Sequence, residues 1–299
     1  TSMGACASFL YNLRQGITDI QSGRSRIAIV GNSEAPIVPE VVEGYSAMSA
    51  LASDKELRQL DNGVLDYRRA CRPFGENCGF TLAESAQFVV LFDDSLALEL
   101  GAKMYGAVTD VFINADGHKK SISAPGVGNY LTVAKAMGSA RGLLGEESIR
   151  QRSFIQAHGT GTPQNRVTES DILNRTAEVF GIDSWPVVAV KSYLGHSVGT
   201  AGADQLVASL GVWEEGILPG INTIDGPAPD VACSHLNISR HHKEVGAEGM
   251  DSAIINAKGF GGNNASATVI APHIVAKMVA SKHKSSAWSS YQARAEQVQ

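Results

Sequence analysis

The spacing of apolar residues along the chain predicts an alternation of helices and strands. Residues 8–21 carry an apolar stripe with helical spacing, and the stripe ends at Gly23. Two short apolar runs, 26–31 and 86–92, predict buried strands, and residues 105–116 alternate enough to predict a long strand. The first third of the chain is therefore expected to place one helix beside several strands.

Residues 34–85 follow no clean period and are rich in turn residues, which predicts an irregular excursion with short helices. The pattern then becomes regular. Further helices are predicted over 94–102, 127–144, 167–179 and 198–214. Further strands are predicted near 154–157, 187–191, 236–239, 252–257 and 266–271. This alternation indicates an α/β fold with a largely parallel sheet.

Composition narrows the class of protein. The 299 residues suffice to bury a substantial core, and 43% hydrophobic with 18% charged residues is ordinary for a globular protein. A formal net charge of -5 argues against a nucleic-acid surface or a basic membrane patch, and the apolar runs are too short to span a membrane. The four irregularly spaced cysteines suggest neither a disulfide framework nor a zinc site, so we expect a reduced, cytoplasmic setting.

Cys6 stands among small residues just before the first predicted helix. A helix N-terminus presents unpaired N–H groups and partial positive charge, which favour thiolate over thiol. The small neighbours leave room for a substrate to approach. Cys6 is thus a candidate nucleophile, and a buried, inert cysteine is the alternative that this stretch leaves open.

Two histidines follow predicted strands, where α/β folds place their ligand sites. His158 opens HGTGT, whose Thr160 and Thr162 offer hydroxyls to a polar ligand, and Lys191 precedes His196 by five residues at the end of another strand. Each histidine alone fits a hydrogen-bonded structural role. No acidic or cysteine residue stands at a spacing that would complete a metal site with them.

The glycine-rich turn around Phe260 follows another apolar strand. Its backbone N–H groups can approach a ligand closely, and backbone donors near a thiol nucleophile are what an oxyanion requires. A plain turn between strands is the alternative.

Four segments in this order resemble the β-ketoacyl-ACP synthases, the condensing enzymes of the thiolase fold. They are GACAS (4–8), HGTGTP (158–163), KSYLGHSVGTAG (191–202) and GFGGNNA (259–265), and CRPFGENCGFTLAESA (71–86) also looks like a segment of that family. The resemblance implies an α/β fold of the layered, thiolase-like α/β/α/β/α kind. Family members keep the nucleophile well inside the chain, so its place at residue 6 leads us to expect that the leading part of the first half is missing.

The resemblance also implies a role for each residue. Cys6 would be acylated by the primer thioester, while His158 and His196 would serve the malonyl half-reaction and not Cys6 activation. Lys191 would be a supporting cation, and Glu169 a structural carboxylate paired with it.

Three further roles follow from the same resemblance. Thr160 and Thr162 would contact the phosphopantetheine arm. The amides of Cys6 and Phe260 would form the oxyanion hole, with Phe260 as a gate.

The implied activity is a decarboxylative Claisen condensation of a Cys-bound acyl group with malonyl-ACP, in fatty-acid or related biosynthesis. The resemblance implies no metal or redox cofactor. It implies an acyl carrier protein as partner, acyl-CoA or malonyl-ACP thioesters as substrates, and a homodimer for the full-length protein. Two alternatives remain: a non-catalytic subunit of the chain-length-factor type, which generally lacks the cysteine, and a thiolase, which carries a second reactive cysteine in a C-x-G motif.

The resemblance divides the chain into the remainder of an N-terminal half (1–104), a C-terminal half (105–272) and a polar tail (273–299) that forms a surface tail or a terminal helix. This chain departs from the family at Lys258, where an aromatic residue is usual, and at Gln164-Asn165-Arg166. A cation near the acyl pocket puts long-chain specificity in doubt. The departures suggest a divergent bacterial branch, such as one that makes acetoacetyl-ACP.

Overall fold

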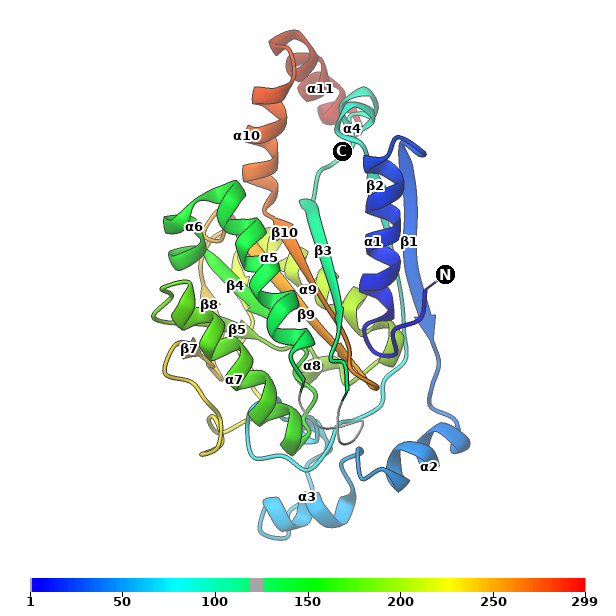
Figure 1. Cartoon of the computed structure of the whole chain (residues 1–299), viewed down its shortest axis with the longest axis vertical. Coiled ribbons are helices and arrows are strands. Elements are labelled where there is room, and N and C mark those ends of the chain that lie inside the picture. Colours follow the sequence, from blue (N-terminus) through cyan, green and yellow to red (C-terminus); the bar gives the residue numbers. More distant parts are fainter. Residues whose placement is uncertain (1, 119–125, 299) are drawn as a thin grey trace.

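A six-stranded mixed sheet forms the centre of the molecule in the computed structural model, which describes residues 2–118 and 126–298 (Figure 1). In spatial order its strands are β3 (Ala107–Ala115), β10 (Asn263–Ile270), β9 (Ser252–Gly259), β4 (Ser153–Gln156), β5 (Trp185–Val188) and β7 (Leu236–Asn237). The strands β9, β4, β5 and β7 are parallel, as the sequence predicts. The prediction fails at β10, which is antiparallel to both neighbours because a short turn returns the chain directly from β9.

Helices cover both faces of this sheet (Figure 1). On one face, α5 (Gly128–Leu144) and α7 (Pro163–Val179) pack against Ile155 and Ile254 of the sheet. On the other, α1 (Ser8–Gln21) and α9 (Ala201–Glu215) pack against Phe154. Successive strand residues point to opposite faces, so both are apolar, which explains the continuous hydrophobic runs in the sequence.

A separate antiparallel pair, β1 (Ile27–Glu34) with β2 (Ser85–Phe92), lies beside α1. The sequence predicts two buried strands here, and the structure corrects this. Val30 packs on α1, whereas Ile29 is 72% exposed and Phe88 is 63% exposed on the opposite face. Within the described residues, helices cover one side of this pair only, so half of its apolar side chains face outward.

The excursion between these two strands contains the expected short helices: α2 (Pro39–Ala47), α3 (Asp54–Leu60) and the 3₁₀ turn η1 (Tyr67–Arg69). Other short elements are α4 (Asp94–Leu100), α6 (Glu146–Gln151), α8 (Lys191–Leu194), η2 (Val198–Thr200), and the two-stranded β6 (Ile217–Leu218) and β8 (Lys243–Glu244). The helix α7 begins four residues before its predicted start, because Pro163 fits the first turn of a helix.

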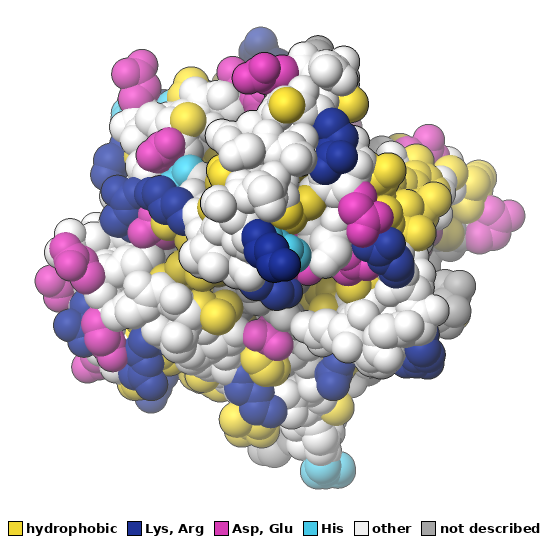
Figure 2. Space-filling view, turned by 90° about the horizontal axis from the view of Figure 1, so that it is seen from above, with side chains coloured by type: hydrophobic (Ala, Val, Ile, Leu, Met, Phe, Trp, Pro, Cys, Tyr) yellow, Lys and Arg dark blue, Asp and Glu magenta, His cyan; other side chains and the backbone are white. Residues whose placement is uncertain are grey.

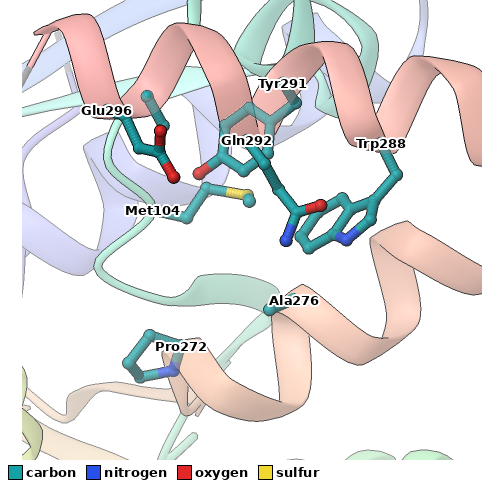
Figure 3. A pocket seen from close by; sticks show the side chains of 8 residues that line it. Met104, Pro272, Ala276, Trp288, Tyr291, Gln292 and Glu296 are labelled. Atoms are coloured by element: carbon teal, nitrogen blue, oxygen red, sulfur yellow. The ribbon is translucent and has the colours of Figure 1, made fainter.

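The last part of the chain forms α10 (Pro272–Lys282) and α11 (Ser285–Val298), so the terminal-helix alternative holds up to residue 298, and residue 299 lies outside the described residues. These helices bury Val275, Val279 and Tyr291 against α4 and the end of the sheet. The Tyr291 hydroxyl donates to the Ala102 carbonyl oxygen over 3.1 Å. Figure 3 shows Tyr291 lying above Met104 in the space between the two helices.

The surface carries charges of both signs. Figure 2 shows lysine, arginine, aspartate and glutamate side chains interspersed over the face seen from above. Within the described part of the chain, no helix combines the length and apolarity that a membrane crossing requires.

Two isoleucines on strands provide a matched test of this architecture. Ile155 in β4 is fully buried, so Ile155→Ala should lower the free energy of unfolding by about 2–5 kcal/mol, since it opens a cavity in the core. Ile29→Ala in β1 should change it by less than about 0.5 kcal/mol because the side chain is exposed. Urea titrations of both variants measure this, and an equal loss would mean that the outer face of β1 is covered in solution.

Candidate active site

Cys6 lies in a tight turn immediately before α1. Its neighbour Ala5 adopts a left-handed backbone conformation with φ 49°, which is unfavourable for a residue with a Cβ. Ser8 stabilises the turn: its hydroxyl accepts from the Gly4 amide at 2.9 Å and donates to the Ala5 carbonyl oxygen at 2.6 Å. The turn directs the thiol into a cavity of about 660 Å³.

Both histidines lie beside this thiol, although 152 residues separate Cys6 from His158 in the sequence. The Nε2 atom of His196 lies 3.1 Å from the Cys6 sulfur, within hydrogen-bonding distance. The centroids of the His158 and His196 rings are 5.5 Å apart and their planes are nearly perpendicular. The structure therefore brings the three residues together at the carboxyl ends of the parallel strands.

One backbone segment, residues 79–83, holds the two histidine loops in place. The His196 amide donates to the Thr81 carbonyl oxygen at 2.7 Å, and the Ala83 amide donates to the His196 carbonyl oxygen at 3.0 Å. The Gly79 amide donates to the Gly161 carbonyl oxygen in the other loop. Residues 79–83, which belong to the segment 71–86 that resembles the family, therefore connect the two histidine loops through backbone hydrogen bonds.

Lys191 is almost fully buried beneath the histidines, with 2% of its surface exposed. Its ammonium donates to the His158 carbonyl oxygen at 2.5 Å, which fixes the His158 loop over the lysine. Burial lowers the pKa of Lys191, while the nearby Glu169 carboxylate acts in the opposite direction.

Glu169 in α7 is completely buried, and it interacts with Lys191 through charge. Its carboxylate accepts from the amides of His158 and Gly159 at 2.7 and 2.9 Å. The side-chain amides of Asn165 and Asn256 each donate to it at 2.8 Å. The carboxylate therefore holds the His158 loop through hydrogen bonds and attracts Lys191 only across the loop.

The glycine-rich turn between β9 and β10 supplies the expected backbone donor. The backbone groups of Phe260 and Cys6 lie close enough to the Cys6 sulfur to act against the rise of its pKa. The close approach requires glycine, since a Cβ on Gly259 would lie 2.2 Å from the Gly4 carbonyl oxygen. Both backbone groups thus lie near the atom at which an acyl group would be attached.

The thiol is not held as a thiolate, which corrects the expectation drawn from the helix start. Burial raises the pKa of Cys6 to about 11, although Lys191 and the amides of Phe260 and Cys6 act to lower it. Loss of water around the sulfur outweighs the nearby positive charges and donors. Deprotonation therefore needs a base, and His196 is in contact with the thiol.

Both imidazoles are buried, and burial lowers the pKa of each well below its usual range, with Lys191 acting in the same direction. They are neutral at physiological pH. A neutral imidazole can accept a proton from a thiol or, as the other tautomer, donate to an oxygen.

The cavity wall contains most of the remaining residues that the sequence singles out. Thr160 and Thr162 line it with their hydroxyl oxygens 3.2 Å apart. Phe260 lies at its edge and is 37% exposed. Among the described residues, Cys6 is the cysteine that lines the cavity, and no three His, Cys, Asp or Glu side chains are grouped to hold a metal ion.

The sequence reasoning does not identify two aromatic residues near the site, Phe80 on the cavity wall and Tyr45 behind Phe260. Phe80 packs edge-on against His196, with ring centroids 5.1 Å apart, and Tyr45 stacks on Phe260 at 6.0 Å. Phe80 belongs to the recognised segment 71–86, so its position could have been suspected. Tyr45 lies in the irregular excursion, where no pattern distinguishes it.

Comparison with known proteins agrees with this arrangement. The family model "Beta-ketoacyl synthase, N-terminal domain" matches residues 1–97, and "Beta-ketoacyl synthase, C-terminal domain" matches residues 105–225. The Beta-ketoacyl-[acyl-carrier-protein] synthase FabY of Pseudomonas aeruginosa is 59% identical over 296 residues, which cover 99% of this chain and 46% of that protein. The 3-oxoacyl-[acyl-carrier-protein] synthase 2 of Vibrio cholerae is 29% identical, over 88% of this chain and 59% of its own.

Comparison with solved structures also finds ketosynthases. The crystal structure of the ketosynthase FabY from P. aeruginosa superimposes with a TM-score of 0.97 at 59% identity, over 99% of this chain and 46% of that one. A type II ketosynthase in complex with its acyl-carrier protein matches at 24% identity with a TM-score of 0.76, over 90% of this chain and 62% of that chain, which supports the thiolase-like fold alone. The chain spans about half the length of the P. aeruginosa relative. With both family domains present in order, this chain belongs to the β-ketoacyl synthase family.

Proposed function

We propose that this chain is the condensing unit of a β-ketoacyl-ACP synthase, an acyltransferase that joins an acyl group to malonyl-ACP with loss of CO₂. The observation that carries the proposal is the contact between two side chains: His196 Nε2 lies 3.1 Å from Cys6 Sγ, and the backbone of Phe260 is near enough to act on the pKa of the same thiol. This set provides a nucleophile, a base and an oxyanion site.

In the first half-reaction, the Cys6 sulfur attacks the carbonyl carbon of the primer thioester. Unlike the role that the resemblance implies, the contact with Cys6 makes His196 the group that accepts the thiol proton. The new C–S bond forms at Cys6, the bond between the acyl carbon and the carrier sulfur breaks, and the carrier thiol leaves with the proton that His196 returns. The two amides stabilise the oxyanion of the tetrahedral intermediate, because backbone donors held in place need no reorganisation. This route suits a thiol whose pKa of about 11 leaves it protonated at neutral pH.

In the second half-reaction, the bond between the malonyl carboxylate and its α-carbon breaks. Carbon dioxide leaves, and the electron pair forms the enolate of the thioester. His158 and His196 would donate to the enolate oxygen, and Lys191, held against the His158 loop, would keep the local potential positive. The enolate carbon then attacks the acyl-Cys6 carbonyl and the C–S bond to Cys6 breaks. The released Cys6 thiolate takes up a proton from solvent and returns to the resting thiol.

The chemistry is complete without a metal or redox cofactor, because decarboxylation supplies the electron pair for the new bond; we propose that none is used. Thr160 and Thr162 are placed on the wall to contact the phosphopantetheine arm of an acyl carrier protein. A homodimer and a cytoplasmic location complete the proposal, the latter supported by four free cysteines.

Two alternatives from other classes receive less support. A non-catalytic subunit would not need Cys6 in contact with His196. A thiolase would need a second thiol beside the first, whereas Cys71 and Cys78 are absent from the described cavity wall and Cys233 is exposed.

The proposal is tested by incubating the intact protein with acetyl-CoA or acyl-ACP and then adding malonyl-ACP. Mass spectrometry should show one acyl group on the peptide that contains Cys6, followed by release of a β-ketoacyl thioester. The Cys6→Ala variant should take up no acyl group, while Cys233→Ala should behave as the wild type. Acylation of another residue, or a stable acyl-enzyme that never reacts with malonyl-ACP, would argue against the function.

The two histidines should differ in the half-reactions they support. Each His→Ala change should lower the condensation rate by about 10²–10³-fold, since each removes a donor from the developing enolate. His196→Ala should also slow acylation of Cys6, because His196 contacts the thiol, whereas His158→Ala should leave acylation nearly unchanged. Single-turnover rates measure both steps, with His241→Ala as an exposed control. Equal effects of the two changes on acylation would contradict this assignment.

The raised thiol pKa predicts how Cys6 responds to pH. Since only the thiolate reacts with iodoacetamide, alkylation of Cys6 should rise about tenfold for each pH unit between pH 7 and pH 9, well below its pKa of about 11. Peptide mapping of protein quenched at short times gives the rate at Cys6 alone. A rate that is independent of pH over this range would indicate a thiolate that is already formed.

A further inference from the structure

A second buried carboxylate lies beside the His196 loop, and the proposed reaction does not use it. Asp204 is in the first turn of α9 and is only 5% exposed. Its carboxylate accepts hydrogen bonds from Ser197, which directly follows His196, and from Ser85 and Gln87 of β2. Asp204 therefore connects the loop of a catalytic histidine with a strand from the other half of the chain.

The hydrogen bonds divide the work of the two carboxylate oxygens. Oδ1 accepts from Ser85 at 2.6 Å and from Gln87 at 3.2 Å, whereas Oδ2 accepts from Ser197. All three donors are neutral, and a buried carboxylate that loses a donor becomes unfavourable. The bond from Ser197 is thus the one through which Asp204 acts on the His196 loop, and the bonds from β2 hold the carboxylate itself in place.

The His196 loop contains a strained residue that makes such a bond necessary. Val198, two residues after His196, adopts a left-handed backbone conformation with φ 49°. This conformation is unfavourable for a β-branched residue and persists only where surrounding contacts enforce it. Ser197 lies between His196 and Val198, so its hydrogen bond to Asp204 holds the loop where relief of the strain would move the histidine.

The position of His196 matters because its ring must stay in contact with the nucleophile. Backbone hydrogen bonds with Thr81 and Ala83 hold the main chain of His196, and Ser197 adds a side-chain anchor on the following residue. Proton transfer from Cys6 requires the distance of 3.1 Å between Nε2 and the sulfur to remain within hydrogen-bonding range. A displacement of about 1 Å can lower a rate by about a hundredfold.

We infer that Asp204 is a positioning residue, which holds His196 against the Cys6 thiol through Ser197; the inference rests on the proposed function, in which His196 accepts the thiol proton. Asp204 is absent from the described wall of the cavity, so it acts on the rate of Cys6 acylation and not on the affinity for the primer. Its carboxylate remains ionised throughout and exchanges no proton with the substrate.

The test measures single-turnover acylation of Cys6 in the intact protein with acetyl-CoA or acyl-ACP. The amplitude gives the fraction of protein with a folded site, and the rate constant reports how well His196 is placed. Ser197→Ala and Asp204→Ala should each lower the rate constant about tenfold to a hundredfold. The amplitude and the half-saturating primer concentration should stay at wild-type values. Asp204→Asn, which keeps an acceptor oxygen, should recover part of the loss.

A matched control and a double variant separate positioning from stability. Ser209 also lies in α9, is fully buried and donates to the Gln205 carbonyl oxygen at 2.8 Å. Ser209→Ala removes a hydroxyl from the same helix without touching the His196 loop, so it should keep the wild-type rate constant. The double variant Ser197→Ala/Asp204→Ala should be about as slow as Asp204→Ala alone, because both changes break one hydrogen bond.

A lower amplitude with a wild-type rate constant in Ser197→Ala would overturn the inference, since the bond would then only stabilise the fold. Multiplied losses in the double variant would also overturn it, because Asp204 would then act by another route. Ser197→Ala and Asp204→Asn keep the test decisive where Asp204→Ala does not fold. These results leave the proposed function intact, whereas a wild-type protein that takes up no acyl group on Cys6 would reject that function and this inference together.

Discussion

The buried carboxylate of Glu169 is the interaction on which the site depends. A charge completely removed from water is unfavourable unless donors surround it, and four N–H groups from the His158 loop, α7 and β9 do so. Each donor belongs to a segment that must stay in place for the chemistry. Losing any of these hydrogen bonds would leave the buried carboxylate unsatisfied, so α7, β9 and the His158 loop are stabilised in one arrangement. Lys191 adds a further hydrogen bond to this loop by donating to the His158 carbonyl oxygen.

A second constraint joins the two halves of the chain. Gly259 packs so closely on the Gly4 carbonyl oxygen that any side chain there would clash, and this contact brings the Phe260 backbone near enough to Cys6 to act on the pKa of its thiol. The segment around Thr81 fastens the His196 loop to the same region. Cys6, His196 and the turn at Phe260 thus come from distant parts of the sequence but are held together by backbone contacts, which vary little with side-chain motion.

Burial of the side chains around the cavity determines their protonation states. Burial keeps the Cys6 thiol protonated and both histidines neutral, so the resting site carries its positive charge on lysines. Such a site stabilises negative charge when it develops on an oxygen and avoids holding a reactive thiolate before substrate arrives. The sequence argument named residues that meet at the cavity but expected a thiolate, because it considered the helix start without the opposing effect of burying the sulfur.

The sequence by itself determined the α/β alternation, most element positions and the residues that gather at the site, since periodicity and ordered motifs are local properties that a chain displays directly. Cys6, His158, Lys191 and His196 could all be named in this way. Only the tertiary structure decided that β10 runs antiparallel, that the outer face of β1 and β2 is exposed, and that Glu169 accepts from the His158 amide. It also decided that Lys258 meets Asn165 and Thr168 on the cavity wall. These outcomes depend on which segments that are distant in the sequence pack together and exclude water. A local sequence pattern does not contain this information.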